Sequence, residues 1–344
     1  MKYRTLGNTG LMVSELCMGT MTFGGDGIFK FIGALGQQDA NALVDKALDA
    51  GINFFDTADS YAMHQSEQML GKALGDRRKE VIVATKARFR MNDNVNAVGL
   101  TRHHLFNQVE KSLQALNTDY IDLFQIHSVD PITPLEETLR ALNDLVQQGK
   151  VRYIGYSNLT AWQAMKALSI SRQHGWNEFK SAQVYYSIAG RELERSTVPF
   201  ALDQSIAILP WSPLAGGFLS GKFTRENQSA EGSRRTDFDF PPIDKEKAFD
   251  IVEVMRDIAD NKNVSVPQIA LAWLLHKPGV TSVIIGAKKM SQLEDNLKSV
   301  DVSLNAEEMT RLDEVSQLGL EYPGWFGLSP SDRMPGERGW SQQE

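Results

Sequence analysis

Short apolar runs alternate with longer amphipathic segments along almost the whole chain. The runs are SELCMGT, INFFDTA, VIVATK, IDLFQIH, VRYIGYSN, SAQVYYS, IAILPWSP and TSVIIGA. Nearly continuous apolar runs of this length are typical of parallel strands that are covered on both faces. The longer segments between them have the spacing of helices. About eight strand–helix units predict a closed (β/α)₈ barrel and argue against an open doubly wound sheet.

Two of the intervening segments carry recognisable helix ends. A helix within residues 39–51 is expected to stop at Gly51, because glycine readily takes the left-handed conformation that ends a helix. A helix within residues 133–150 is expected to begin with Thr133 as its N-cap and Pro134 as its first residue.

The two ends of the chain lie outside the alternation. Residues 1–14 predict a small hairpin that turns at GNTG and covers the bottom of the barrel. Residues 316–344 are rich in Gly, Pro and Trp, without a helical period, and predict an ordered tail over the barrel mouth. No linker divides the chain, so residues 1–344 are interpreted as a single domain.

Composition narrows the possible partners. The net charge of −7 argues against a nucleic-acid or anionic-membrane surface. With Cys17 as the one cysteine, no internal disulfide can form, and we expect a reducing, cytoplasmic location. Cys17 stands between Leu16 and Met18 and is interpreted as a core residue. His103 and His104 are adjacent and so face different sides of a helix, which predicts no metal site.

Polar residues follow the apolar runs where the predicted strands end. Asp56 ends the second strand, and Tyr61 follows in the next loop. Lys86 ends the third strand and His127 the fourth. Because the carboxyl ends of barrel strands form the functional face, these four side chains are expected to converge at one mouth.

Such a set suits proton donation to a carbonyl. A free phenol has a pKa of about 10, and an ammonium about 4 Å away favours the phenolate by roughly 4 kcal/mol at an effective dielectric near 20. Lys86 would therefore lower the pKa of Tyr61 toward the working range. Asp56 would keep Lys86 charged, and His127 would orient the substrate oxygen. The set has neither a nucleophile nor a metal cage, so it needs an external hydride donor.

Several motifs resemble the aldo-keto reductase superfamily, in the order found in that family. They are NFFDTADSY, SEQMLGKAL, VIVATK, DYIDLFQIH, VRYIGYSN, PWSPLAGGFLSGK and IIGAKKMSQLEDN, and the likeness runs from about Arg4 to Asp313. The resemblance implies a (β/α)₈ barrel that reduces aldehydes and ketones with NADPH. It also implies a catalytic tetrad of Asp56, Tyr61, Lys86 and His127, with Tyr61 as the general acid.

The resemblance also implies where the cofactor lies. Ser157, Asn158 and Gln183 would hold the nicotinamide carboxamide, and Trp211 would stack on the ring where the family usually has a tyrosine. A second lysine follows Lys288, and this positive charge favours NADPH over NADH. The expected cofactor residues are Gly19, Thr20, Asp56, Ser157, Asn158, Gln183, Trp211, Ser212, Pro213, Leu214, Gly216, Lys222, Gly286, Lys288, Gln292, Asp295 and Asn296.

Aromatic residues in the loops predict an apolar substrate pocket. Met63 and His64 stand where relatives usually have small residues, and His64 either narrows the mouth or is an exposed loop histidine. Residues 224–247 are polar and are expected to form a flap over the cofactor. The expected pocket residues are Phe23, Phe29, Phe31, His64, Phe89 and Trp325.

Three other functions can be compared with the same residues. The first is a regulatory subunit on the same fold, like the potassium-channel β subunits, that binds NADPH but turns over slowly. The second is a Schiff-base aldolase that uses Lys86 as its nucleophile. The third, ATP binding at GGFLSGKF, is rejected, since Phe223 replaces the hydroxyl that holds Mg²⁺ in a P-loop.

Overall fold

Eight parallel strands form one barrel. The computed structural model describes residues 1–25, 32–225, 227, 235 and 238–326. The strands pair in the order β10-β3-β4-β5-β6-β7-β8-β9. Ile208 closes the seam between β9 and β10, because its amide donates to Gly279 O (3.1 Å) and its carbonyl accepts from the Thr281 amide (2.9 Å). The predicted barrel is confirmed; its strands are β3 (Leu16–Gly19), β4 (Phe54–Asp56), β5 (Ile82–Ala87), β6 (Ile121–Ile126), β7 (Val151–Ser157), β8 (Phe179–Tyr185), β9 (Ala207–Trp211) and β10 (Val283–Ile285).

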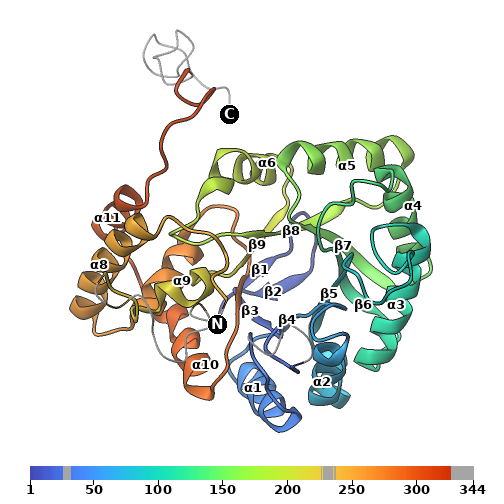
Figure 1. Ribbon diagram of the computed structural model, residues 1–344, viewed down its shortest axis with the longest axis horizontal. Coiled ribbons are helices and arrows are strands. Elements are labelled where there is room, and N and C mark those ends of the chain that lie inside the picture. Colours follow the sequence, from blue (N-terminus) through green and yellow to red (C-terminus); the bar gives the residue numbers. More distant parts are fainter. Residues whose placement is uncertain (26–31, 226, 228–234, 236–237, 327–344) are drawn as a thin grey trace.

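Helices surround the ring of strands (Figure 1). The apolar face of each helix packs on the barrel, as α1 shows by burying Ala40, Leu43, Val44 and Ala47 at helical spacing. Within the described residues the helices are α1 (Gln37–Asp49), α2 (Gln65–Leu74), α3 (Arg102–Leu116), α4 (Leu135–Gln147), α5 (Ala161–His174), α6 (Thr197–Asp203), α8 (Lys245–Lys262), α9 (Val266–His276), α10 (Met290–Leu297) and α11 (Ala306–Val315), with 3₁₀ turns η2 (Gly75–Glu80), η3 (Glu192–Arg195), η4 (Ala215–Ser220) and η5 (Lys298–Asp301).

The start of α4 differs from the prediction. Pro134, not Thr133, is the N-cap, and the helix begins at Leu135. The Thr133 hydroxyl instead donates to the carboxylate of Asp130 at 2.6 Å. This carboxylate also accepts from the amides of Ile132 and Leu100. The preceding turn therefore engages the hydroxyl that would have capped the helix.

The hairpin closes the barrel at the end where the strands begin. Strands β1 (Tyr3–Thr5) and β2 (Met12–Ser14) pair antiparallel, which confirms the predicted hairpin. Leu6 and Val13 from the hairpin join Cys17 and Phe54 in the cluster that fills the barrel interior. At Gly7 (φ +58°), an added Cβ would lie 2.5 Å from the carbonyl oxygen of Lys180, so the turn fits against the start of β8 only without a side chain.

The described part of the tail leads away from the barrel. Figure 1 shows the segment after α11 running out beyond the helices, and residues 320–326 are exposed. Residues 327–344 lie outside the described residues, so the expected cover over the mouth stays a prediction. Among the described helices, none combines the length and apolar character needed to cross a membrane.

Candidate active site

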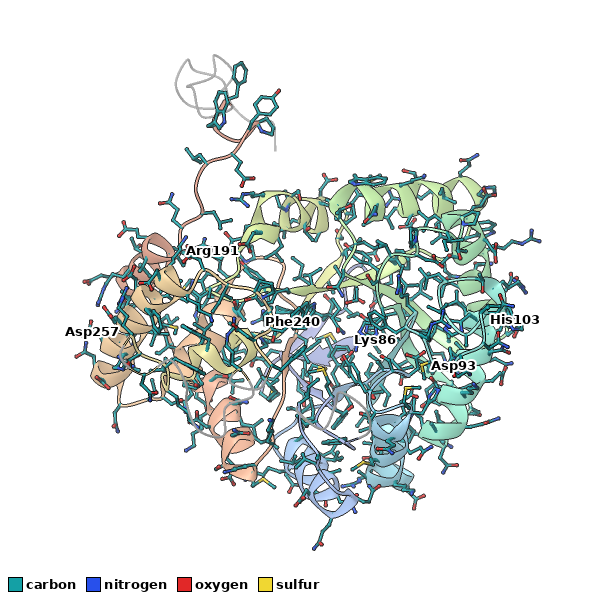
Figure 2. All side chains as sticks on the ribbon, in the orientation of Figure 1. Lys86, Asp93, His103, Arg191, Phe240 and Asp257 are labelled. Carbon is teal, nitrogen blue, oxygen red and sulfur yellow. The ribbon has the colours of Figure 1, made fainter. Side chains whose placement is uncertain are left out.

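Strand alternation brings two of the predicted catalytic residues into the barrel. In β4, Phe54 belongs to the interior cluster and Phe55 to the outer core, so Asp56 points inward again. The same alternation in β5 turns Lys86 inward, and Figure 2 shows Lys86 within the ring of strands. Lys86 has no exposed surface and Asp56 is 2% exposed. The sequence thus places a buried charge pair at the carboxyl end of the sheet.

The Lys86 ammonium is the centre of the site. Its Nζ lies 2.6 Å from Asp56 Oδ1, 2.7 Å from the carbonyl oxygen of Thr57 and 3.2 Å from the hydroxyl of Tyr61. These three acceptors use the three donor positions of an ammonium. Burial alone would lower the pKa of Lys86, but Asp56 and Tyr61 outweigh it and raise the pKa. Lys86 is therefore held as a cation and directed at the phenol.

Two amides hold the second oxygen of Asp56. Gln183 Nε2 donates to Asp56 Oδ2 at 2.7 Å, and Gln125 Nε2 donates to it at 3.3 Å. All three side chains are buried, and hydrogen bonding of this kind is what a buried carboxylate requires. Gln125 was missed in the sequence, although it stands in β6 two residues before His127, which directly follows that strand.

His127 completes the cluster of four. Its ring lies 5.8 Å from that of Tyr61 and 4.7 Å from that of Phe89, both edge to face. Burial lowers the pKa of His127 well below its usual value, and the charges of Lys86 and Arg88 add to this. The imidazole is therefore neutral, and its buried Nδ1 has no hydrogen-bonding partner among the described residues.

The turn that carries Tyr61 is strained. The next three residues, Ala62, Met63 and His64, have φ angles of 47°, 53° and 69°, and none is glycine. Such left-handed residues cost about 1 kcal/mol or more each. The Tyr61 amide donates to Ala58 O, and the carbonyl of Tyr61 accepts from the amide of Ser66. The backbone of Tyr61 is therefore held on both sides by a turn that needs support from its surroundings.

The expected nicotinamide residues lie together beside the tetrad. Asn158 Nδ2 donates to Ser157 Oγ at 2.9 Å and to the carbonyl oxygen of His127 at 3.1 Å. The Trp211 indole donates to Asn158 Oδ1 at 3.1 Å. Phe240 stacks on the indole with an interplanar angle of 11° and a centroid distance of 5.8 Å. Phe240 was not expected here, because nothing in the sequence fixes where the loop between β9 and α8 lies.

The following loop has the conformation of a glycine-rich cradle. Ser212, Ala215, Gly216 and Gly217 have positive φ angles. At Gly216 an added Cβ would lie 2.3 Å from the carbonyl oxygen of Phe240, so the two segments meet there only because glycine has no side chain. Pro213 is buried and Leu214 is partly buried.

The remaining expected cofactor residues extend from the barrel core outward. Gly19 ends β3 beside Asp56, and the amide of Thr20, the next residue, donates to Asp56 O. At the start of α10 the Gln292 side chain accepts from the Lys288 amide, and Asn296 is buried, donating to Gly286 O. Lys222 and Gly286 are exposed and Lys288 is partly buried. Asp295 accepts from Ser265 and Gln268 and lines a hollow of about 700 Å³ between α8, α9 and α10, away from the tetrad.

Of the expected substrate-pocket residues that the structure describes, Phe89 lies beside the tetrad. Phe89 contacts the ring of His127 and is 38% exposed. Phe23 is instead fully buried in the outer core, because its loop folds back onto Leu35. His64 turns inward, away from solvent, and Trp325 lies in the tail against Tyr322 and Phe326. Phe29 and Phe31 lie outside the described residues.

The fold and this site together define a class of protein. A closed barrel that presents a buried Asp–Lys pair, a tyrosine and a neutral histidine at the carboxyl ends of its strands fits a barrel oxidoreductase. Among the described residues no group of His, Cys, Asp and Glu could hold a metal ion. The chain belongs to the aldo/keto reductase family, whose pattern it matches over residues 15–317.

Individual relatives extend over nearly the whole chain. A versiconal hemiacetal acetate reductase of Aspergillus parasiticus is 35% identical, covering 94% of this chain and 99% of its own length. An uncharacterized oxidoreductase of Bacillus subtilis, YrpG, is 35% identical, covering 96% and 98%. A probable voltage-gated potassium channel subunit beta of Oryza sativa is 34% identical, covering 92% and 97%. The chain is thus an oxidoreductase of a family that typically uses NAD(P)H.

Proposed function

We propose that the protein reduces aldehydes and ketones to alcohols with NADPH, and that Tyr61 donates the proton to the carbonyl oxygen. The observation that supports this most is the Lys86 ammonium, which touches both Asp56 (2.6 Å) and the Tyr61 hydroxyl (3.2 Å). A proton donor without a nucleophile or a metal suits a reaction in which the second component is a hydride. When bound, the nicotinamide supplies that hydride to the carbonyl carbon.

The residues present fit a dinucleotide. Trp211 offers a flat face that already stacks an aromatic ring, that of Phe240. Asn158 is exposed beside it and offers an amide of the kind that pairs with a carboxamide. Ala215, Gly216 and Gly217, with successive positive φ angles, supply the concave backbone that binds phosphate oxygens. Trp211, Asn158 and this loop would hold the cofactor, and the lysines at the start of α10 would hold its 2′-phosphate.

Lys86 and Asp56 favour transfer of the Tyr61 hydroxyl proton to the substrate. As Tyr61 gives up its proton to the substrate oxygen, negative charge develops on the phenol oxygen, 3.2 Å from the ammonium. At that distance the cation stabilises the developing phenolate more than the neutral phenol. Asp56 keeps the ammonium charged, and Gln125 and Gln183 keep the carboxylate in place.

His127 orients the substrate. Because its imidazole is neutral, it can donate a hydrogen bond to the carbonyl oxygen without placing a second cation beside Lys86. Phe89 packs edge to face on the ring and limits its rotation. The carbonyl oxygen is thereby directed at Tyr61, whose ring lies 5.8 Å from that of His127.

Steady-state turnover tests the proposal. The wild-type protein should oxidise NADPH in the presence of a panel of aliphatic and aromatic aldehydes and ketones, and the alcohol should form in equal amount. Tyr61→Phe should bind NADPH with unchanged affinity and lose turnover. Absence of NADPH-dependent turnover across the panel, or full turnover by Tyr61→Phe, would refute it.

A regulatory subunit is the second candidate. The similarity to the channel subunit beta from rice favours it, at 34% identity over nearly the full length of both chains. Such a subunit would bind NADPH in the same way and show only residual turnover. Residual rates across the whole panel, with tight NADPH binding, would support this alternative.

The aldolase alternative conflicts with the charge state of Lys86. A Schiff base forms from the neutral amine, whereas Asp56 and Tyr61 raise the pKa of Lys86 against the effect of burial. Borohydride treatment with a carbonyl substrate should therefore leave Lys86 unmodified.

A further inference from the structure

The turn after Tyr61 holds a conformation that its own residues do not favour. Ala62, Met63 and His64 lie in succession in the left-handed region. His64 is also the N-cap of α2, yet its side chain makes no capping hydrogen bond. Backbone hydrogen bonds within the turn, such as that from the His64 amide to Asp59 O (2.8 Å), and contacts with its surroundings together hold this conformation.

The His64 side chain bridges two elements. Its Nδ1 lies 2.5 Å from Oε2 of Glu67 in α2, and its Nε2 lies 3.2 Å from Oε1 of Gln108 in α3. The His64 side chain is 14% exposed and that of Glu67 is fully buried. An exposed loop histidine would make no such pair of contacts. His64 is therefore fixed at both ring nitrogens.

The same contacts reach the strand that carries Lys86. The Thr85 hydroxyl donates to Glu67 Oε1 at 2.6 Å, while Oε2 of that carboxylate meets His64. Because Thr85 precedes Lys86 in β5, its side chain faces outward where that of Lys86 faces inward. The chain His64–Glu67–Thr85 thus joins the turn that bears the phenol to the strand that bears the ammonium.

A second buried carboxyl, that of Asp59, lies near enough to Glu67 to feel its charge. Asp59 is fully buried, and neither of its oxygens has a partner of ordinary hydrogen-bonding geometry among the described residues. Burial raises the pKa of Asp59 well above its usual value, and the charge of Glu67 adds to this. The ring nitrogens of His64 contact Glu67 and Gln108, and not Asp59. The other charged groups that act on Asp59 are Lys86 and Lys111.

We propose that His64 is a positioning residue for Tyr61, fixing the distance between the phenol and Lys86 through Glu67 and Thr85. This inference rests on the proposed function, in which Tyr61 donates a proton. In the part of the chain that the structure describes, the ring of His64 bonds to Glu67 and Gln108 rather than to the phenol or the ammonium, so it acts through the backbone of the turn. A displacement of about 1 Å at a reacting group can cost about a hundredfold in rate.

Three variants separate this role from a merely structural one. His64→Ala removes the bridge and keeps a left-handed non-glycine residue. His64→Gly removes the bridge and also the strain, because glycine accepts the φ of 69°. His174→Ala is the matched control, since it removes another histidine–glutamate pair, with Glu136 at 3.6 Å, at the far end of α5.

The measurements use the aldehyde of the panel that the wild-type protein reduces fastest. We expect kcat to fall 10- to 100-fold in both His64 variants, with unchanged NADPH binding per protein chain. The solvent deuterium isotope effect on kcat should rise, because proton donation becomes slower relative to the other steps. His174→Ala should keep the wild-type kcat and isotope effect. Full kcat in His64→Gly would overturn the proposal, since it would show that only the backbone conformation matters.

The measurements distinguish failure of the proposed function from failure of the role assigned to His64. If the wild-type protein shows no turnover, the proposed function falls and this inference falls with it. If wild-type turnover depends on Tyr61 while His64→Ala keeps its kcat and isotope effect, only the inference is overturned. Should His64→Ala not fold, as shown by lost NADPH binding, Gln108→Leu removes the outer contact alone. We expect a three- to tenfold loss of kcat with a raised isotope effect in that variant, and wild-type values would again overturn the inference.

Discussion

The ammonium of Lys86 lies 3.2 Å from the hydroxyl of Tyr61, across a gap bridged by one hydrogen bond. The two residues come from different segments, Lys86 from within β5 and Tyr61 from the strained turn before α2. The chemistry of the site therefore depends on how that turn meets that strand.

Removal of the phenol hydroxyl should abolish reduction while sparing the cofactor. Tyr61→Phe should lower kcat by about 10²- to 10⁴-fold, the usual contribution of a positioned general acid. NADPH affinity, measured by fluorescence titration, should stay within twofold of wild type. A variant that loses affinity and rate together would instead indicate a disturbed pocket.

Removal of the Lys86 charge should destabilise the fold. Lys86→Met leaves Asp56 buried without its cation, and breaking a buried pair in this way costs about 3–5 kcal/mol. Urea unfolding measures the free-energy difference. The double variant Lys86→Met/Asp56→Asn removes both charges and should recover most of the stability but none of the activity. Equal stability of the single and double variants would contradict the pairing.

His104 should make the protein sensitive to mild acid. Burial lowers the pKa of His104 to about 4, against 6.5 for a free imidazole. Between these two values the unfolded chain binds a proton that the folded chain does not. The contribution of the neutral imidazole is therefore complete above pH 6.5 and is lost as the pH falls toward 4.

Urea unfolding at a series of pH values checks this expectation. The free energy of unfolding should fall less steeply with acidification in His104→Gln than in wild type. The neighbouring His103→Gln is the matched control, because His103 is exposed on α3 and only adds to the effect of burial on the pKa of His104, so its slope should stay closer to wild type than that of His104→Gln. Parallel slopes for His104→Gln and wild type would rule the prediction out.

Lys288 should set the preference between the two nicotinamide cofactors. Lys288→Ala should reduce the ratio of kcat/KM for NADPH over NADH about tenfold, the equivalent of one charged hydrogen bond. The loss should fall on NADPH, since NADH has no 2′-phosphate. Lys72→Ala, which removes an exposed lysine from α2, should leave the ratio unchanged.

Strand alternation explains why the centre of the site was predictable. Once the run ending in Asp56 is recognised as a strand, the inward and outward sides follow from position alone. The same rule applies to Lys86 and His127, and it would also have found Gln125. Parallel strands then bring their carboxyl ends to one edge, which is why these residues meet.

Loop side chains were not predictable in the same way. Nothing in the periodicity of the sequence shows that Phe23 enters the core or that His64 turns toward α3. Phe240 reaches Trp211 through a long loop whose path depends on tertiary contacts such as the close approach at Gly216. The Thr133 hydroxyl was also expected to cap a helix, but it bonds to Asp130 in the preceding turn.

The β1–β2 hairpin limits the route by which small molecules can enter and leave the barrel. Leu6 and Val13 seal the end of the barrel where the strands start, and the charged centre lies toward the opposite end. Any molecule that reaches Lys86 must therefore enter and leave through the end of the barrel opposite the hairpin. Of two molecules bound there together, the one that lies deeper can dissociate only after the one nearer the opening has dissociated.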